Sequence, residues 1–393
     1  FYNGGGYNMR KVCVVTGTRA EYGIIQNLIK LLHEDPEVEL QLLVTGMHLS
    51  PEFGNTIETI IEDGFPISKK VEVLLSSDTP IGISKTMGLG MISFAEALEE
   101  LAPDIMIVLG DRFEIFSAVT AAMIARIPVG HIHGGEATEG LIDEPIRHSI
   151  TKMSHVHFPA TEEYRNRIIQ LGEQPERVFC TGTPGLDNIM SLDLLSKGEF
   201  EKSIEFNLED SPTALLTFHP VTLDFSSAEE QFGEVLAALS AKPEMKVIFT
   251  MPNSDTDGRV IIKMINHFVA KNPKRYKAFV SLGQLRYLSA LKHVDLVIGN
   301  SSSGLIEVPS FKIPTINIGD RQKGRIKAPS VINCEPTVSS IIQALNKAFD
   351  KDFRASLRVL KNPYGEEGAS EKIKDILCEF DLENIIKKKF YDL

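Results

Sequence analysis

The 393-residue sequence has no tryptophan, only four cysteines and no long apolar segment. No stretch approaches the roughly 20 apolar residues of a membrane span, so the sequence predicts no transmembrane helix. The cysteines, at positions 13, 180, 334 and 378, form neither a CxxC pair nor the spacing of a classical zinc site. They are typical of unpaired thiols in a reducing compartment, and we expect a cytoplasmic protein.

Basic residues are also scarce. The chain has 41 Lys and Arg against 53 Asp and Glu, which gives a formal net charge of −12. This balance argues against broad nucleic-acid binding, because phosphate backbones require a basic face. A small anionic ligand would need a local basic site. Residues 1–8 lack a signal-peptide pattern, and we interpret them as an extension ahead of a start methionine, Met9.

Short runs rich in Val and Ile alternate with amphipathic stretches along most of the chain. Residues 12–16 resemble a buried strand and 21–32 a helix, and the same alternation restarts at residues 214–218. Continuously apolar strands separated by helices predict parallel sheets covered on both faces. We therefore expect an α/β protein with an N-terminal Rossmann-like domain at 9–185, a linker region at 186–212, a C-terminal Rossmann-like domain at 213–375 and a helical tail at 376–393.

Two doubly wound units would bind a ligand in a cleft at the carboxyl ends of their strands. In the first such loop, Thr16–Glu21, Gly17 allows a tight turn. The free N–H groups of the following helix and the side chain of Arg19 would suit a phosphate. GxGxxG is absent, so from this loop alone an ordinary turn is the better interpretation. Asp111 follows the apolar run at residues 105–109. It would act either as a general acid or base, or as the cap of the next helix.

The densest cluster of titratable residues is HIHGGE at residues 131–136, followed by Asp143, Glu144, Arg147 and His148. On a strand, His131 and His133 would share a face, and the two glycines would place Glu136 near it. Such a cluster suits proton transfer. HxH is also a metal-ligand spacing, but no third ligand is obvious. We expect Asp143 or Glu144 to cap a helix that begins near Pro145.

In the second half, His219 ends a strand and would face Arg19 across the cleft. The segment GNSSSG, with Ser301, Ser302 and Gly304, suggests an anion site at a helix N-terminus, with Glu307 one turn later as a ligand of a ribose diol. A serine-rich helix cap is the alternative. The loop 319–325, which includes Arg321, either supplies local positive potential or is merely solvated.

Taken together, TGTRAEYG, VLGDRFE, HIHGGE with DEPIRHSITK, HPVT, GNSSSGLIEVPS and INIGDRQKGR resemble the hydrolysing UDP-N-acetylglucosamine 2-epimerases of sialic-acid biosynthesis (the bacterial NeuC type). The resemblance runs in order from about Met9 to near Asn333. It implies a GT-B-like fold of two Rossmann-like domains, the second binding UDP, with an interdomain cleft. It implies neither a cofactor nor a metal, and it suggests a homo-oligomer, a dimer or tetramer, through helices of the first domain.

The resemblance implies conversion of UDP-N-acetylglucosamine to N-acetylmannosamine and UDP through a 2-acetamidoglucal. UDP leaves C1, which acidifies C2–H, and a carboxylate removes that proton. Water then adds at C1 while C2 is protonated on the opposite face. By motif position, the acid–base set is Asp111, Glu136 and Asp143 with His131 nearby. The UDP site by motif position comprises Arg19, His219, Ser301, Ser302, Gly304, Glu307 and Arg321.

The sequence departs from part of the family at His133, where some relatives carry Glu. This leaves the C2 base open between Asp111, Glu136 and Asp143. It also allows a different sugar, the UDP-2,4-diacetamido-2,4,6-trideoxyglucose of the legionaminic-acid pathway. A non-hydrolysing epimerase, a GT-B glycosyltransferase and a non-catalytic UDP-sugar sensor are the remaining alternatives.

Overall fold

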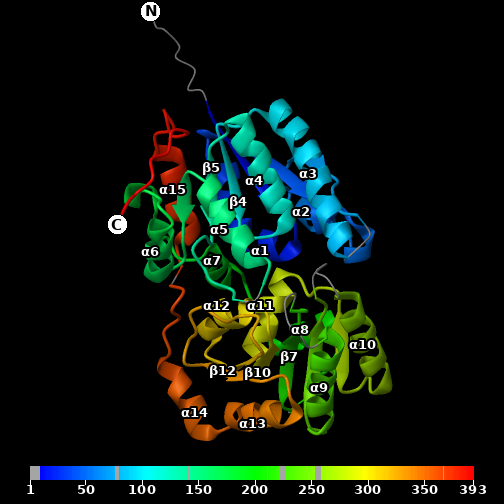
Figure 1. The fold of residues 1–393 in the computed structure, drawn as a ribbon. Coiled ribbons are helices and arrows are strands. Elements are labelled where there is room, and N and C mark those ends of the chain that lie inside the picture. The colour runs from blue at the N-terminus through cyan, green and yellow to red at the C-terminus, as the bar shows by residue number, and fades with distance from the viewer. Residues whose placement is uncertain are drawn as a thin grey trace, which may run out of the picture.

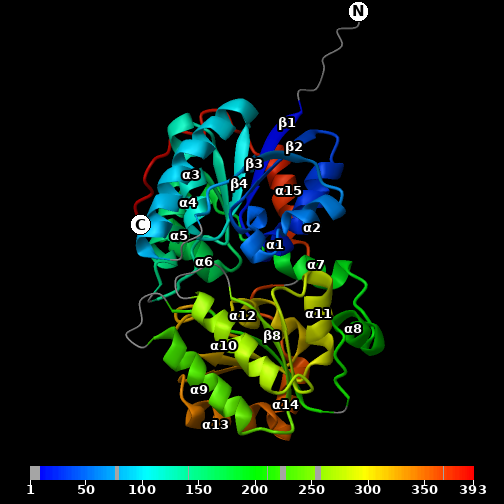
Figure 2. The ribbon, with the colours of Figure 1, turned by 90° about the vertical axis from the view of Figure 1, so that its right-hand side faces the viewer.

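The computed structural model describes residues 9–75, 79–139, 141–209, 211–221, 227–252, 258–365 and 367–393, without the side chains of residues 190 and 191. Figures 1 and 2 show two α/β units, one above the other, each built on a parallel sheet between layers of helices. Each sheet has six strands. The predicted fold class, two Rossmann-like units in a GT-B-like arrangement, is confirmed.

The first sheet has the strand order β3-β2-β1-β4-β5-β6. In β1, Val12 and Val14 join the hydrophobic core on one face, whereas Cys13 and Val15 join the core on the other. Burial on both faces explains the unbroken apolar runs of the sequence. The strands are β1 (Arg10–Thr16), β2 (Val38–Thr45), β3 (Ile67–Val71), β4 (Ile105–Leu109), β5 (Val129–Ile132) and β6 (Val156–Phe158). The helices are α1 (Arg19–Glu34), α2 (Ile57–Glu62), α3 (Pro80–Leu101), α4 (Phe113–Ala125), α5 (Asp143–Met153) and α6 (Glu162–Gln170).

The second sheet has the order β12-β11-β10-β7-β8-β9, and helices also cover both of its faces. Its strands are β7 (Thr213–Thr217), β8 (Lys246–Thr250), β9 (Tyr276–Phe279), β10 (Leu296–Gly299), β11 (Thr315–Ile318) and β12 (Val331–Cys334). The helices are α9 (Ala228–Ser240), α10 (Gly258–Lys271), α11 (Gln284–His293), α12 (Ser303–Ile306), α13 (Val338–Ala348) and α14 (Lys351–Ser356).

The strand order reverses between β1 and β4 in the first sheet and between β7 and β10 in the second. Open parallel sheets bind ligands at such reversals, beyond the carboxyl ends of the strands. Asp111, His219 and Ser301 lie in the loops after these strands, and Arg19 opens the helix that follows β1. The topology therefore brings the candidate loops of each half to its switch point.

The chain passes between the two sheets twice. The proposed linker region 186–212 carries α7 (Asp187–Ser191) and α8 (Lys197–Ile204). After α14 the chain returns, and α15 (Ala369–Glu379) packs against the first sheet through Ile373 and Leu377. The Asp187 carboxylate joins the two passages, since it accepts hydrogen bonds from the backbone N–H groups of residues 368, 369 and 370 at 2.6, 3.1 and 2.7 Å.

The expected helical tail at 376–393 is wrong in its position. Its helix begins at Ala369, and the described residues after Glu379 form no helix. Arg10 Nη1 donates to the carbonyl oxygen of Phe380 at 2.9 Å, and Arg177 Nη1 donates to that of Ile385 at 2.9 Å. These contacts hold the tail as an irregular strap along the first unit. The boundaries of the domains otherwise stay a proposal.

At the edge of the first sheet, Val178 forms a single parallel bridge with His157, and α3 begins at Pro80. Within the described residues, no helix is both long and apolar enough to cross a membrane.

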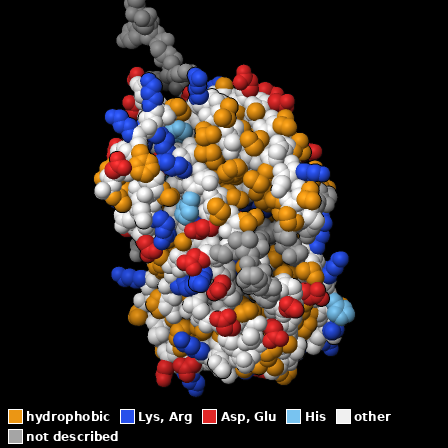
Figure 3. Space-filling model, in the orientation of Figure 1, with side chains coloured by type: hydrophobic (Ala, Val, Ile, Leu, Met, Phe, Trp, Pro, Cys, Tyr) orange, Lys and Arg blue, Asp and Glu red, His pale blue; other side chains and the backbone are white. Residues whose placement is uncertain are grey.

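Figure 3 shows hydrophobic side chains over α3 and α4, where Ile81, Ile92 and Ile124 are strongly exposed. This surface favours the oligomer contact that the resemblance suggests, which stays a prediction.

Candidate active site

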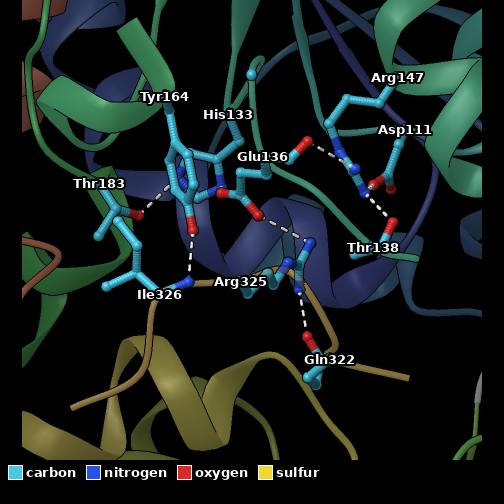
Figure 4. A network of polar contacts seen from close by, with 12 residues as sticks. Asp111, His133, Glu136, Thr138, Arg147, Tyr164, Thr183, Gln322, Arg325 and Ile326 are labelled. Atoms are coloured by element: carbon cyan, nitrogen blue, oxygen red, sulfur yellow. Dashed lines mark hydrogen bonds and ion pairs between the residues drawn. The ribbon is translucent and has the colours of Figure 1, made fainter. Parts of the chain in front are cut away.

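Arg147 is the centre of a buried polar network at the carboxyl ends of β4 and β5 (Figure 4). Its side chain is 1% exposed. One guanidinium nitrogen forms an ion pair with Asp111 and donates to Thr138 Oγ1 at 2.9 Å. The other donates to the backbone oxygen of Glu136 at 3.1 Å and to Glu144 Oε2 at 3.0 Å. Arg147 thus fixes the loops that carry Asp111 and Glu136 relative to each other.

Asp111 lies in the loop between β4 and α4 with its side chain 20% exposed. Burial alone would raise the pKa of this carboxyl, but the charges of Arg147, Arg325 and Arg321 hold that pKa below its ordinary value. Asp111 is therefore ionised at neutral pH, as a proton acceptor must be.

Glu136 is 1% exposed, and neither of its carboxylate oxygens makes a hydrogen bond with a described residue. Arg325, from the second unit, places Nη2 2.8 Å from Glu136 Oε2, and the Nδ1 atom of His133 lies 3.6 Å from Oε1. A buried carboxylate normally fills its hydrogen-bonding capacity. The carboxylate of Glu136 is therefore paired in charge but retains acceptor capacity for a ligand.

The two histidines of HIHGGE do not share a strand face as expected. β5 ends at Ile132, and His133 has φ +63°, in the left-handed region. His131 is fully buried, with Nε2 2.7 Å from Gly110 O and Nδ1 3.1 Å from Thr151 Oγ1. Burial lowers the pKa of His131 to about 3, so its ring is neutral. Because both ring nitrogens are engaged, we assign His131 to structural support rather than to proton transfer.

The expected helix cap by Asp143 or Glu144 is wrong. Helix α5 begins at Asp143 itself, and its N-cap is Ile142, which has no capping side chain. Glu144 instead turns back to Thr138 and to Arg147 and, at 3.0 Å, to His148. Asp143 is half-buried and lies one helical turn before Arg147, so it faces the same side of α5 as the network.

The loop after β1 has the form of an ordinary strand–helix turn, which is the better interpretation of this loop alone. Thr18 and Glu21 form a capping box, and Glu21 Oε2 accepts from the backbone N–H groups of Gly17 at 2.9 Å and Thr18 at 3.1 Å. Those N–H groups are therefore not available to a phosphate. Burial first, and then the charge of Arg286, lowers the pKa of Arg19. The side chain of Arg19 lies against Gly283 of the second unit, where an added Cβ would collide with its Nη2.

In the second unit, Asn300 ties the candidate loops together. Its side chain accepts from the backbone N–H of His219 at 2.7 Å and donates to the backbone oxygen of His219 at 2.8 Å. Its own backbone oxygen accepts from Arg321 Nη1 at 3.0 Å and from Gln322 Nε2 at 2.8 Å. His219, Arg321 and the serine loop are thus held at one end of the second sheet.

The serine loop leads into α12, a single short turn, with Glu307 at its end. The structure gives no hydrogen bond from the backbone N–H groups of Ser301 and Ser302 to any described residue. The Ser303 hydroxyl donates to Glu307, and Tyr287 contacts the same hydroxyl. Burial raises the pKa of Glu307 to about 7. Gly304 is buried at the start of this turn, against Thr315.

Sequence reasoning placed Arg325 in the basic loop 319–325 without singling it out, missed Tyr164 and Tyr364, and did not recognise the central role of Arg147. The charge of Arg147 on a polar helix resembles an ordinary solvated face, and only the T-x-x-E pattern at Thr18 and Glu21 was a readable local signal. In the described residues, no group of three or more His, Cys, Asp and Glu side chains is arranged to hold a metal ion.

A family model described as UDP-N-acetylglucosamine 2-epimerase matches residues 30–378. The chain belongs to this family. It is 42% identical to the polysialic acid biosynthesis protein P7 of Escherichia coli over 98% of each chain. It is 40% identical to a GDP/UDP-N,N'-diacetylbacillosamine 2-epimerase (hydrolyzing) of Campylobacter jejuni, which covers 98% of this chain and 99% of that one. These relatives support a UDP-sugar 2-epimerase of the hydrolysing type.

Solved structures of this family have the same fold. A UDP-GlcNAc 2-epimerase from Neisseria meningitidis bound to UDP-GlcNAc aligns with a TM-score of 0.79 at 20% identity, over 93% of this chain and 99% of that chain. A UDP-GlcNAc 2-epimerase from Methanocaldococcus jannaschii aligns with a TM-score of 0.76 at 20% identity, over 93% and 99%. At this identity the likeness carries the fold and no detail of the site.

Proposed function

We propose that this family member hydrolyses a UDP-linked 2-acetamido sugar and inverts its C2, which releases UDP and the free 2-epimer. The proposed machinery is divided between the units. Arg19 of the first unit, with His219, Ser301, Ser302, Gly304, Glu307 and Arg321 of the second, binds UDP. Asp111, Glu136 and Asp143 move the proton at C2. The observation that carries the proposal is the buried Glu136 carboxylate with open acceptor capacity between the units.

The chemistry begins with the C1–O bond, which breaks so that UDP leaves with the bonding electrons. A carboxylate takes the C2 proton, and C1 and C2 form the double bond of a glycal. Water then adds through its oxygen to C1 and gives up a proton to a carboxylate, while an acid returns a proton to the opposite face of C2. Cations aimed at the departing diphosphate stabilise the first step, and such preorganised charge is often the largest catalytic contribution.

The ionised state of Asp111 makes it the first candidate for the base that removes the C2 proton. The low pKa of this carboxyl suits a step in which departure of UDP has already acidified C2–H. Glu136 and Asp143 are then the candidates for protonation from the other face. His133 is buried next to this set, with Nδ1 3.6 Å from Glu136 Oε1 and Nε2 2.7 Å from Thr183 Oγ1.

We propose UDP-N,N'-diacetylbacillosamine, which is UDP-2,4-diacetamido-2,4,6-trideoxyglucose, as the substrate. The C. jejuni relative is named for this sugar, and so is a hydrolyzing 2-epimerase of Legionella pneumophila, which is 36% identical over 97% of this chain and 99% of that one. UDP-GlcNAc is the second candidate, because the relative at 42% identity is named for polysialic acid biosynthesis.

The test supplies both UDP-sugars separately, in D₂O, and follows the products by NMR. We expect UDP and a free 2-epimer that carries one deuterium at C2, with the higher kcat/KM on the diacetamido sugar. Asp111→Asn and Glu136→Gln should each lower kcat by about 10²–10⁴-fold, the usual contribution of a general acid or base. UDP binding by calorimetry should change little. A UDP-linked product, an unlabelled C2 or near-normal rates in both variants would contradict the proposal.

A further inference from the structure

Arg325 is a cation of the second unit that is buried within the carboxylate cluster of the first. Its side chain is 11% exposed and lies 2.8 Å from Glu136 Oε2 (Figure 4). On its other side, Nη1 donates to Gln322 Oε1 at 2.8 Å, and Gln322 is in turn bonded to the backbone of Asn300. The guanidinium is therefore anchored to the loops proposed for UDP while it points at the loop proposed for proton transfer.

A ring of hydrogen bonds fixes the residue that follows Arg325 against the first unit. The backbone N–H of Ile326 donates to the Tyr164 hydroxyl at 3.0 Å, and the Tyr364 hydroxyl donates to the backbone oxygen of Ile326 at 3.0 Å. The two hydroxyls are 3.1 Å apart, so Tyr164 is left as the donor to Tyr364. Every donor in the ring has an acceptor, and the ring lies among buried apolar side chains, including Leu305 and Ile306.

Backbone contacts before Arg325 complete this attachment. The N–H of Glu139 donates to the backbone oxygen of Lys323 at 3.1 Å. Gly324 has φ +88°, and a Cβ there would lie 3.0 Å from the Cβ of Ala137. The segment 323–326 is thus seated on the loop that follows Glu136, and only a closed arrangement of the two units places Arg325 at that carboxylate.

We propose that Arg325 is a positioning residue that the second unit contributes to the proton-transfer carboxylates of the first, so that the set is complete only when the units are closed on each other. This inference rests on the proposed function. It joins departure of the nucleotide to proton transfer, because the loop that carries Arg325 also carries Arg321 and Gln322, which hold Asn300 beside the serine loop.

The electrostatics of the site support this role. The charge of Arg325 is among those that hold the pKa of Asp111 down. Burial lowers the pKa of Arg325, but the carboxylates of Glu136 and Asp111 outweigh burial and raise it, so the guanidinium stays charged. The titratable and charged groups around this pair of carboxylates include Arg147, Arg321, Arg325, His131, His133, Glu144, Tyr164 and Tyr364. Among them, Arg325 and Arg321 are the cations on the loop that follows β11.

The test compares the pH dependence of kcat in the wild-type enzyme with Arg325→Met and Arg325→Lys. On the acidic side of the pH profile, called the acid limb here, kcat falls as the essential base of the bound complex takes up a proton. Loss of this opposite charge raises the pKa of the Asp111 carboxyl, so the acid limb of Arg325→Met should move to higher pH. At neutral pH, kcat should also fall, because Arg325→Met leaves the buried Glu136 carboxylate without its paired cation. Arg325→Lys keeps the cation, so its acid limb should return close to the wild-type position.

Lys323→Met is the matched control, since it removes a cation from the same loop. Lys323 lies 3.6 Å from Glu139, and both side chains are more than half exposed. Its acid limb should coincide with that of the wild type. UDP affinity, measured by calorimetry, should change less than threefold in the Arg325 and Lys323 variants. An acid limb that stays in place in Arg325→Met, whatever happens to kcat, would show a merely structural residue and overturn the inference.

Tyr164→Phe provides a second test if Arg325→Met does not fold. It removes one hydroxyl and leaves every charge in place, so kcat should fall about 2- to 13-fold, with an acid limb displaced in the same direction. Wild-type kcat and an undisplaced limb in this variant would overturn the inference. The proposed function fails separately, because then the wild-type protein itself would release neither UDP nor a C2-deuterated sugar.

Discussion

Replacement of Arg147 by methionine tests whether this buried guanidinium holds the site together. The variant keeps much of the side-chain length but leaves Asp111 and Glu144 without their common cation. Removal of one partner from a buried ion pair costs about 3–5 kcal/mol. The two carboxylates are 20% and 28% exposed, so water can reach them, and we expect the lower end, about 3 kcal/mol. In a unit of this size that corresponds to a fall of about 6–12 °C in Tm.

The pH dependence of this loss follows from the carboxylates. For Asp111 and Glu144, burial alone would raise the pKa, but hydrogen bonds and nearby cations lower it below the ordinary value. A lowered pKa in the folded state contributes stability that is present above the ordinary carboxyl pKa of about 4 and is lost as pH falls through the folded-state pKa. The difference in unfolding free energy between wild type and Arg147→Met should therefore be largest near pH 7 and shrink below about pH 4.

Equilibrium unfolding in denaturant at several pH values measures this difference. Lys69→Met is the control, because the ion pair of Lys69 with Glu100 is at the surface, with side chains 33% and 62% exposed. Such pairs contribute about 0–1 kcal/mol. A loss in Arg147→Met as small as that of the control, or one equally large at pH 3.5 and pH 7, would refute the central role of Arg147.

Further predictions concern UDP binding and Glu307. Arg19→Ala should weaken UDP binding by about 10- to 150-fold in calorimetry. Gly283→Ala should also weaken UDP binding, because the added Cβ displaces the Arg19 guanidinium. A Gly283→Ala variant with unchanged affinity would place UDP away from Arg19. Because burial raises the pKa of Glu307 to about 7, its stabilisation is complete below the ordinary pKa and lost as pH rises through about 7. Glu307→Gln should gain unfolding free energy relative to wild type between pH 5 and pH 8, and no relative change would show an unperturbed carboxyl.

The order of strands and helices was predictable wherever a strand is buried on both faces. Val12–Thr16 and Ile105–Leu109 are read directly as apolar runs, because each face of the sheet is covered. The edge strand β3 was missed because its sequence, ISKKV, is mostly polar and only Val71 is fully buried. The exposed edge strand β12 was missed for a similar reason, since it contains Asn333 and is only partly buried.

Contacts between distant parts of the chain were the other limit. Helix α15 follows the second sheet in sequence but buries Ile373 and Leu377 in the first, which no local pattern indicates. Arg325 and Glu136 are separated by nearly half the chain, and their pairing depends on how the two units meet. The capping box of Thr18 and Glu21 was predictable from the local sequence. It occupies the backbone N–H groups of Gly17 and Thr18, which otherwise suggest a phosphate site.

Arg147 and Arg19 differ in how far their charges are already paired. Arg147 is saturated by Asp111, Glu144, Thr138 and the backbone of Glu136, so it has little left for a phosphate. Arg19 has the opposite surroundings, because burial and the neighbouring charge of Arg286 both lower its pKa. An anion placed beside Arg19 and Arg286 would relieve the repulsion between these two cations. The same anion beside Asp111 would be repelled by an ionised carboxylate. This difference in charge supports the proposal that the diphosphate binds at Arg19 rather than beside Asp111.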